Sequence, residues 1–332
     1  MRQATGVFEY LYSMRAWLLV LFFFDWTASR SQTIPPTDST PVLRLDSANL
    51  PAPRSRRIWA TAGQTAGYGT TLVLLNQTWY SQYPRSAWKV FNDWEEWKQM
   101  DKLGHVYGTY VQGRASMEIW RWAGVPRKTR IWVGGLTGTA FQTLVEYMDG
   151  RSDAWGWSWG DIGANILGSA TLIAQELAWD EQRIQLKLSF HPTRYQDPVL
   201  QQRSIDLFGE RWTSRMMKDY NAQTYWASFR IKSFLKNARI PEWLCVSVGT
   251  GASGLWGGEN NIKKDPSGNI LFDRSDIPRR RQWYLSPDID LTKIRTRKKW
   301  VRFALLTLSA FKVPLPTLAY EAGKWTLHPL YF

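Results

Sequence analysis

The residues best suited to acid–base chemistry lie in two groups near the middle of the chain. The first group holds Asp101, Lys102 and His105, and the second holds Glu146 and Asp161. Asp101 and His105 are four residues apart, so a helix would place both side chains on one face. Histidine titrates closest to neutral pH, and a carboxylate can orient it. We therefore identify His105, Asp101, Glu146 and Asp161 as candidate catalytic residues.

Four neighbouring residues are candidates for substrate binding: Lys102, Asn165, Trp157 and Trp159. In this enzyme interpretation His105 acts as general acid or base, and Lys102 holds an anionic substrate by its charge. The natural substrate class is a phosphate or glycan of a lipid-linked envelope molecule. The sequence contains no Gly-x-Ser-x-Gly, His-Glu-x-x-His or phosphate-loop motif, so it identifies no nucleophile.

The same residues could instead form a structural network. Buried polar groups need partners, and helical bundles use such contacts to fix register. Asp161 would then cap the N-terminus of its helix, and His105 would lie within hydrogen-bond reach of a carboxylate such as Glu146. A metal site is the weaker alternative, because the other two histidines, His191 and His328, lie beside prolines in the second half of the chain. We assign no metal and no cofactor.

Helical segments must position these residues. Four segments have helical composition, and each contains small residues spaced four apart, which lets helices approach closely. The first carries no charge and is expected to be a buried helix, and the whole region is expected to form a four-helix bundle with a polar seam. The third and fourth have uncharged runs of about fifteen residues, shorter than the roughly twenty that cross a bilayer. The segments are 58–83, a stretch through Asp101 and His105 to about 122, about 128–148, and about 161–177.

The second half of the chain has a different periodicity. Polar and apolar residues alternate there, which is typical of strands, and we expect a β-rich region over 181–332. Basic clusters at 279–281 and 295–299 suit either an anionic membrane face or a solvated loop. The strand candidates are 183–190, 225–231, 243–248, 283–291, 325–327 and 330–332, whereas 305–311 could be helix or strand.

The N-terminal residues and the composition indicate export. An apolar run at 16–24 follows two arginines and precedes small residues, as in a signal peptide cleaved near residue 31. A proline-rich linker follows at 32–57.

The composition indicates which partners to expect. The chain contains 21 tryptophans and its net charge is +14, so anionic lipid or lipopolysaccharide is an expected partner. A protein partner is an alternative, and export disfavours nucleic acid. The single cysteine, Cys245, excludes an internal disulfide.

The central motifs resemble a known family. Asp101-Lys102-x-x-His105, then Glu146, and then Asp161 within a Gly- and Trp-rich stretch are similar to the YfiM-like family of predicted periplasmic lipoproteins of unknown function. The resemblance covers about residues 90–180, and the order of the motifs is also similar to a more distant, membrane-embedded VanZ-like pattern. The resemblance to the YfiM-like family implies a helical domain and a periplasmic location, and it implies no established reaction.

We therefore predict an α+β protein with four parts: a signal peptide at 1–31, a linker at 32–57, a helical domain at 58–180 and a β-rich region at 181–332. The leading hypothesis is an exported protein of the periplasm or outer membrane with an interaction or envelope-maintenance role. One alternative is an enzyme or binding protein for an anionic lipid-linked substrate that uses His105. A second is an outer-membrane β-barrel with a helical periplasmic part. Whether the chain is an enzyme stays open.

Overall fold

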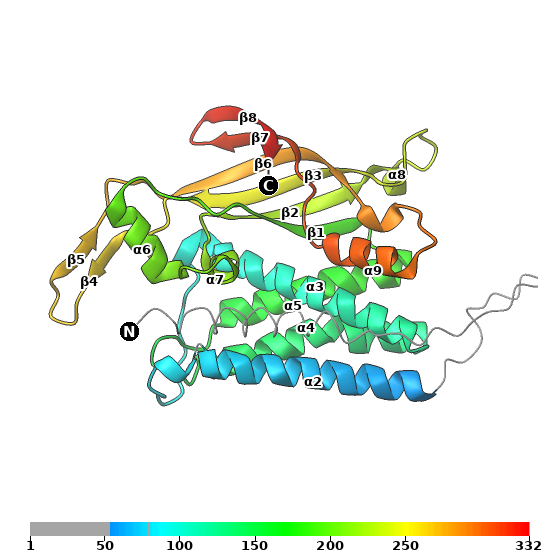
Figure 1. Ribbon diagram of the computed structural model, residues 1–332, viewed down its shortest axis with the longest axis horizontal. Coiled ribbons are helices and arrows are strands. Elements are labelled where there is room, and N and C mark those ends of the chain that lie inside the picture. The colour runs from blue at the N-terminus through cyan, green and yellow to red at the C-terminus, as the bar shows by residue number, and fades with distance from the viewer. Residues whose placement is uncertain (1–53, 79, 332) are drawn as a thin grey trace, which may run out of the picture.

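The computed structural model describes residues 54–78 and 80–331, so the expected signal peptide and most of the expected linker lie outside the described residues. A layer of long helices lies on one side and an antiparallel sheet on the other (Figure 1). The fold is therefore α+β, with the helices first in the chain and the six-stranded sheet in its C-terminal half. None of the described helices has the length and apolarity needed to traverse a bilayer.

Four long helices correspond to the four predicted segments. They are α2 (Arg54–Thr78), α3 (Met100–Trp122), α4 (Arg127–Asp149) and α5 (Trp159–Trp179), with the short 3-10 turns η1 (Tyr80–Gln82) and η2 (Glu96–Gln99) between α2 and α3. Pro126 precedes α4 as its N-cap residue, and Ser158 caps α5 by accepting a hydrogen bond from a backbone N–H of the first turn. Local sequence signals therefore set both helix starts.

Helices α3, α4 and α5 pack closely because glycines face neighbouring backbones. A Cβ on Gly138 would lie 2.4 Å from the Thr109 carbonyl oxygen, and one on Gly168 would lie 2.2 Å from the Val106 carbonyl oxygen. Neither position has room for a larger side chain. The predicted close approach of helices at small residues is thus present between α3 and each of its two neighbours.

The expectation of a buried first helix is wrong. Most of α2 is exposed, including Ile58 and Trp59, and the helix lies along the outside of the other three (Figure 1). Tyr68 contacts Phe141 of α4 at a ring distance of 5.0 Å, and Gln64 accepts a hydrogen bond from the Ser116 hydroxyl of α3. Absence of charge therefore did not indicate burial. The helix also begins at Arg54, inside the expected linker.

The sheet has the strand order β1-β2-β3-β6-β7-β8, and every neighbouring pair is antiparallel. The strands are β1 (Ile184–Phe190), β2 (Gln223–Arg230), β3 (Leu244–Ser253), β6 (Arg280–Ile289), β7 (Leu315–Glu321) and β8 (Lys324–Tyr331). A separate hairpin is formed by β4 (Ile262–Lys264) and β5 (Ile270–Asp273). The remaining elements are α6 (Pro198–Phe208), α7 (Trp212–Lys218), α8 (Ile231–Phe234), η3 (Leu291–Lys293) and α9 (Lys299–Leu308). In segment 305–311, ambiguous in the sequence, residues 305–308 form the end of α9 and Phe311 makes an isolated parallel bridge with Leu188.

One face of the sheet packs on the helices near its β1 edge. Leu186 of β1 packs against the core cluster that Tyr110, Leu172 and their neighbours form among the helices. The phenol oxygen of Tyr225 in β2 lies 3.0 Å from where a Cβ on Gly104 of α3 would stand. These contacts hold α3 directly beneath the first two strands.

The opposite face of the sheet is buried and partly charged. Lys187 and Asp288 are both fully buried, and their side chains form an ion pair of 2.7 Å. Two hydroxyls, from Ser228 and Ser247, donate to the same Asp288 carboxylate. Cys245 is also buried, with an exposed fraction of 1%. A charged pair with its own hydrogen-bond donors therefore occupies the place that apolar side chains usually take.

Candidate functional site

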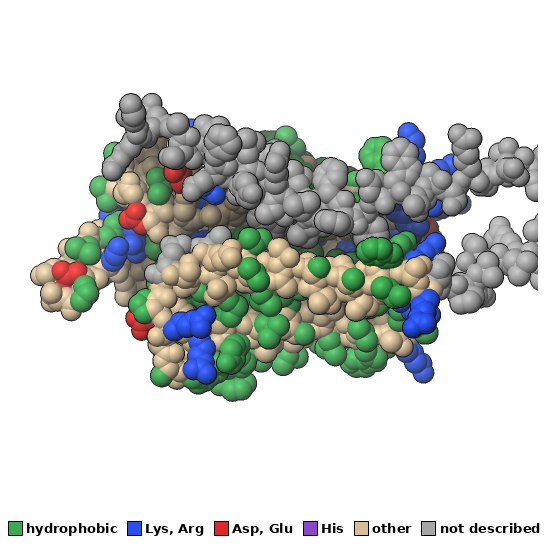
Figure 2. Space-filling model, turned by 60° about the horizontal axis from the view of Figure 1, so that its bottom comes forward, with side chains coloured by type: hydrophobic (Ala, Val, Ile, Leu, Met, Phe, Trp, Pro, Cys, Tyr) green, Lys and Arg blue, Asp and Glu red, His purple; other side chains and the backbone are tan. Residues whose placement is uncertain are grey.

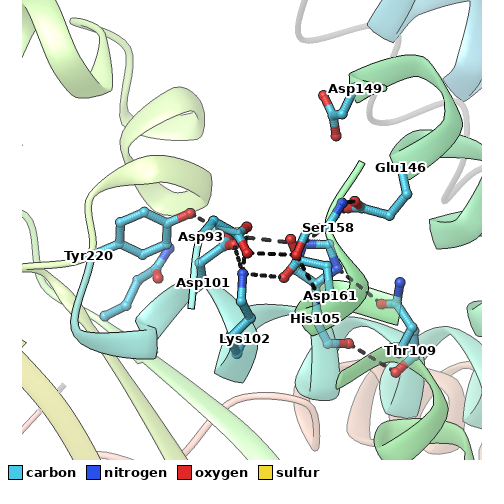
Figure 3. A network of polar contacts seen from close by, with 12 residues as sticks. Asp93, Asp101, Lys102, His105, Thr109, Glu146, Asp149, Ser158, Asp161 and Tyr220 are labelled. Carbon is cyan, nitrogen blue, oxygen red and sulfur yellow. Dashed lines mark hydrogen bonds and ion pairs between the residues drawn. The ribbon is translucent and has the colours of Figure 1, made fainter. Parts of the chain in front are cut away.

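Three helices bring the predicted site residues together beneath the sheet. Helix α3 supplies Asp101, Lys102 and His105, α4 supplies Glu146, and α5 supplies Asp161. Figure 3 shows their polar ends pointing toward one another. The i, i+4 spacing of the α3 pair and the close packing at glycines together produce this convergence. We call this set, with Asn165 of α5, the His105 centre.

One ring nitrogen of His105 makes a hydrogen bond to Asn165, and the other ring nitrogen faces three carboxylates. Its Nδ1 lies 3.0 Å from Oδ1 of Asn165, an acceptor, so Nδ1 carries the hydrogen. Its Nε2 lies 3.6 Å from Asp161 Oδ1, 3.7 Å from Glu146 Oε1 and 3.9 Å from Asp101 Oδ1. These distances are within ion-pair range but longer than a direct hydrogen bond, so the expected hydrogen bond to a carboxylate is not formed.

Lys102 is fixed by carboxylates. Its Nζ lies 2.6 Å from Asp93, 2.7 Å from Asp161 and 3.2 Å from Asp101, and the side chain is 8% exposed. Those charges outweigh the effect of burial and raise the pKa of Lys102. An ammonium group with three anionic neighbours has little capacity left for an anionic substrate, which argues against the substrate-binding role expected for Lys102.

The expectation that Asp161 caps its helix is wrong. Ser158 is the N-cap residue, and its Oγ accepts the Asp161 N–H at 3.0 Å. The Asp161 carboxylate turns instead toward Lys102 and His105. Its Oδ1 is buried and lies 2.7 Å from Nζ of Lys102, so the ammonium group engages this oxygen. The carboxylate therefore belongs to the His105 centre and does not cap its own helix.

Burial and mutual charge shift the pKa values throughout the centre. Burial raises the pKa of Glu146 to about 8, and burial with the Asp101 charge raises that of Asp161 to about 7. Burial alone would lower the pKa of His105, but Asp101, Asp161 and Glu146 raise it. Burial acts to raise the pKa of Asp101, yet His105 and Lys102 lower it overall. Such perturbed groups gathered in one place are typical of functional sites.

Three residues of this network are not among the candidates identified from the sequence. Asp93 lies before α3, and its carboxylate binds Lys102 and accepts a hydrogen bond from the Ser158 hydroxyl. Ser158 also donates its backbone N–H to Glu146 at 3.3 Å. Tyr220, which follows α7, donates its hydroxyl to Asp101 at 2.7 Å. No spacing in the sequence links Tyr220 to Asp101, because only the tertiary fold brings the two together.

Trp157 and Trp159 occupy a different kind of surface. Their rings meet edge to face with centroids 5.3 Å apart, and Trp157 also contacts Trp88 at 5.2 Å. Trp159 is 67% exposed. The contacts of these rings are therefore with other aromatic side chains, at the edge of the helical layer.

The geometry of the His105 centre suits a shared cation. Asp101, His105 and Asp161 each offer one ligand atom, and these atoms lie within 4.8 Å of one another. Atoms that bind one transition metal at about 2.1 Å stand roughly 3–3.6 Å apart, so only a small adjustment is needed. The side chains of His105 and Asp101 are 16% and 26% exposed, so the centre is not completely closed to solvent. One imidazole and two carboxylates form a donor set that zinc, manganese or iron accepts.

Comparison with known proteins identifies the same part of the chain. Residues 89–175 match the model of a family described as predicted periplasmic lipoprotein (DUF2279), and the match spans α3, α4 and most of α5. Searches of curated proteins and of solved structures returned no match. The VanZ-like pattern finds no support in these comparisons. The segment that carries the His105 centre is thus similar to a family of predicted periplasmic lipoproteins whose function is unknown.

Proposed function

We propose that this chain is an exported envelope-maintenance protein whose working site is the His105 centre, and that the centre holds a divalent metal ion. The observation that carries the proposal is the position of Nε2 of His105. It faces three carboxylate oxygens from three helices at 3.6–3.9 Å, while Asn165 fixes the other ring nitrogen. A metal ion there would be held by the ring nitrogen and by oxygens of Asp101 and Asp161, and these three ligand atoms lie within 4.8 Å of one another.

The charges of the centre support the same proposal. Four carboxyl groups, from Asp93, Asp101, Glu146 and Asp161, surround one lysine and one histidine. Because the pKa of Glu146 is raised to about 8 and that of Asp161 to about 7, the centre without a metal has little net charge with which to attract an anionic, lipid-linked envelope component. A bound divalent ion would add positive charge and attract a phosphate or carboxylate group. The metal is therefore what would allow this site to take an anionic envelope substrate.

Metal binding is tested by calorimetry on protein first treated with a chelator. We expect one Zn²⁺ or Mn²⁺ per chain, and at least a tenfold weaker affinity in the His105→Gln variant. The control is His328→Gln, which removes a histidine from β8 and should leave the affinity unchanged. Equal affinity in wild type and His105→Gln, or no binding by either, would refute the metal site.

A second candidate function is acid–base catalysis by His105 without a metal. The hydrogen bond from Nδ1 to Asn165 favours it, because it leaves Nε2 as the atom that exchanges a proton. In this case Asn165→Ala would alter the pH profile of turnover with a lipid-linked phosphate substrate, and chelators would have no effect. A structural network would instead predict that His105→Gln lowers the melting temperature and changes neither metal affinity nor turnover.

A further inference from the structure

The outward faces of α4 and α5 are apolar along almost their whole length. On α4 the exposed large side chains recur at helical spacing, so they form one stripe. The sequence of α4 has no charged residue between Arg130 and Glu146, and Glu146 is buried. The stripe consists of Trp132, Val133, Leu136, Leu144 and Tyr147.

Helix α5 reverses the usual arrangement of a helix in water. Its polar side chains point inward, and the residues that face out are apolar, with Ile166 at 54%, Leu167 at 58% and Leu177 at 45% exposed. No charged residue lies between Asp161 and Glu176, and both of these acids are buried. The buried polar residues are Asp161, Asn165, Ser169, Gln175 and Glu176. A helix with this polarity requires an apolar neighbour on its outer side.

The two stripes belong to one surface. Arg127 at the start of α4 donates to Asp180 after the end of α5 at 2.6 Å, so the helices run antiparallel side by side. Glu146 near the end of α4 accepts the Ser158 N–H before α5. Figure 2, a view from the side of the helical layer, shows hydrophobic side chains scattered over that surface, with Lys and Arg mainly near its two ends. We call this surface the helical apolar face.

Basic and aromatic residues frame the helical apolar face. Lys128 stands at one end of α4 and Arg151 at the other, and both are exposed. Trp132 and Tyr147 lie near the same two ends, with aliphatic Leu136 between them. Aromatic rings and cationic groups around an aliphatic centre are the arrangement found where proteins meet the lipid headgroups.

We propose that the helical apolar face docks on the surface of an anionic phospholipid bilayer, with the aliphatic residues against the hydrocarbon and the basic ends at the phosphates. Charge selects this occupant over a second copy of the chain. Lys128 is exposed at one end of the face and Arg151 at the other, so two copies packed face to face would set one of these basic side chains against another in either orientation. A bilayer supplies the apolar surface and the negative charges together.

The test is flotation of the purified full chain with vesicles of phosphatidylethanolamine and phosphatidylglycerol, and with vesicles of phosphatidylcholine. We expect Leu136→Gln/Leu167→Gln to reduce the bound fraction at least tenfold on both. Lys128→Gln/Arg151→Gln should reduce binding only on the anionic vesicles. At high salt this variant and the wild type should bind the anionic vesicles equally, because salt screens the charges. The matched control is Leu327→Gln/Leu330→Gln, which changes two leucines of β8 that are 68% and 60% exposed and should bind as wild type.

Three results would overturn the proposal. The first is absence of vesicle binding by the wild-type chain. The second is loss of binding in the β8 control with full binding in Leu136→Gln/Leu167→Gln, which would move the contact to the sheet. The third is a wild-type dimer, detected by light scattering, that Leu136→Gln/Leu167→Gln converts to a monomer without any effect on vesicles. Unchanged melting temperatures of the variants establish that each comparison is between folded proteins.

Discussion

His105 depends on residues that a sequence pattern reveals only in part. The four-residue spacing to Asp101 was sufficient to predict that the two share a helix face, and the structure places Glu146 and Asp161 beside them. The sequence predicts that Asp161 caps α5, whereas the structure shows that Ser158 caps it. The sequence does not distinguish the two, because both a serine and a carboxylate three residues after it suit a helix N-terminus. Tyr220 could not be predicted at all, since its contact joins residues 119 positions apart.

Glu146 provides a pH test at the level of one residue. Its folded pKa of about 8 lies above the ordinary value, so the folded state binds more protons between about pH 4.5 and 8. Its contribution to stability is complete at low pH and is lost as pH rises through 8. With a chelator present, we expect Glu146→Gln to be roughly 2–4 kcal/mol more stable than wild type at pH 8.5 and nearly equal at pH 4.5. Urea unfolding at both pH values measures this, and equal stabilities at pH 8.5 would contradict it.

The buried pair Lys187 and Asp288 gives a second residue-level prediction. Removing one partner leaves a charge without compensation in a place that water does not reach, so Lys187→Met should cost about 3–5 kcal/mol of unfolding free energy. The exposed pair of Arg274 and Asp276, at 2.9 Å, is the control, and Asp276→Asn should cost less than about 1 kcal/mol. Denaturant titration of both variants decides the matter. Similar losses would mean that burial does not govern the strength of the pair.

At the scale of elements, the sequence predicts where the helices lie in the chain better than it predicts whether they are buried. Helical composition and the spacing of small residues predicted the extent of α4 and α5 and the end of α3 within a few residues, because these signals act locally. The lack of charge in α2 predicts a buried helix, yet that helix is mostly exposed. Alternation located β1, β2, β3, β6 and β8 but missed β7 and the hairpin of β4 and β5, whose short runs carry little periodicity.

Alanine substitutions at two glycines of α5 measure two different effects: close helix packing at Gly168 and intrinsic helix preference at Gly163. A Cβ at Gly168 would lie 2.1 Å from Thr109 Oγ1 and 2.2 Å from a backbone oxygen of α3, whereas a Cβ at Gly163 has no atom within 4 Å. We expect Gly168→Ala to destabilise the protein by about 1–3 kcal/mol or more, since α3 and α5 must separate. Gly163→Ala should be stabilising by roughly 0.5–1 kcal/mol. Thermal unfolding compares the two, and a harmless Gly168→Ala would show that the contact of α3 with α5 is loose.

At the scale of the whole molecule, the division into a helical and a β-rich half stays a prediction. Contacts among α3, α4 and α5 are self-contained in the first half, while β1 and β2 use α3 as their support. We expect residues 54–180 to unfold cooperatively when expressed alone and residues 181–332 to lack a cooperative transition, because their strands lose the helix that covers them. Circular dichroism with heating measures both pieces. A cooperative transition in the second piece alone would place the folding core in the sheet.

The single thiol of the chain has a practical consequence. Cys245 lies in β3 between two neighbouring strands, it is 1% exposed, and burial raises its pKa to about 11. A thiol reagent can therefore modify it only when the sheet opens, so the rate of labelling reports the frequency of that opening. No cysteine needs to be added or removed for such a measurement. Slower labelling in the presence of vesicles or of a metal ion would show that binding at the helical layer makes opening of the sheet less frequent.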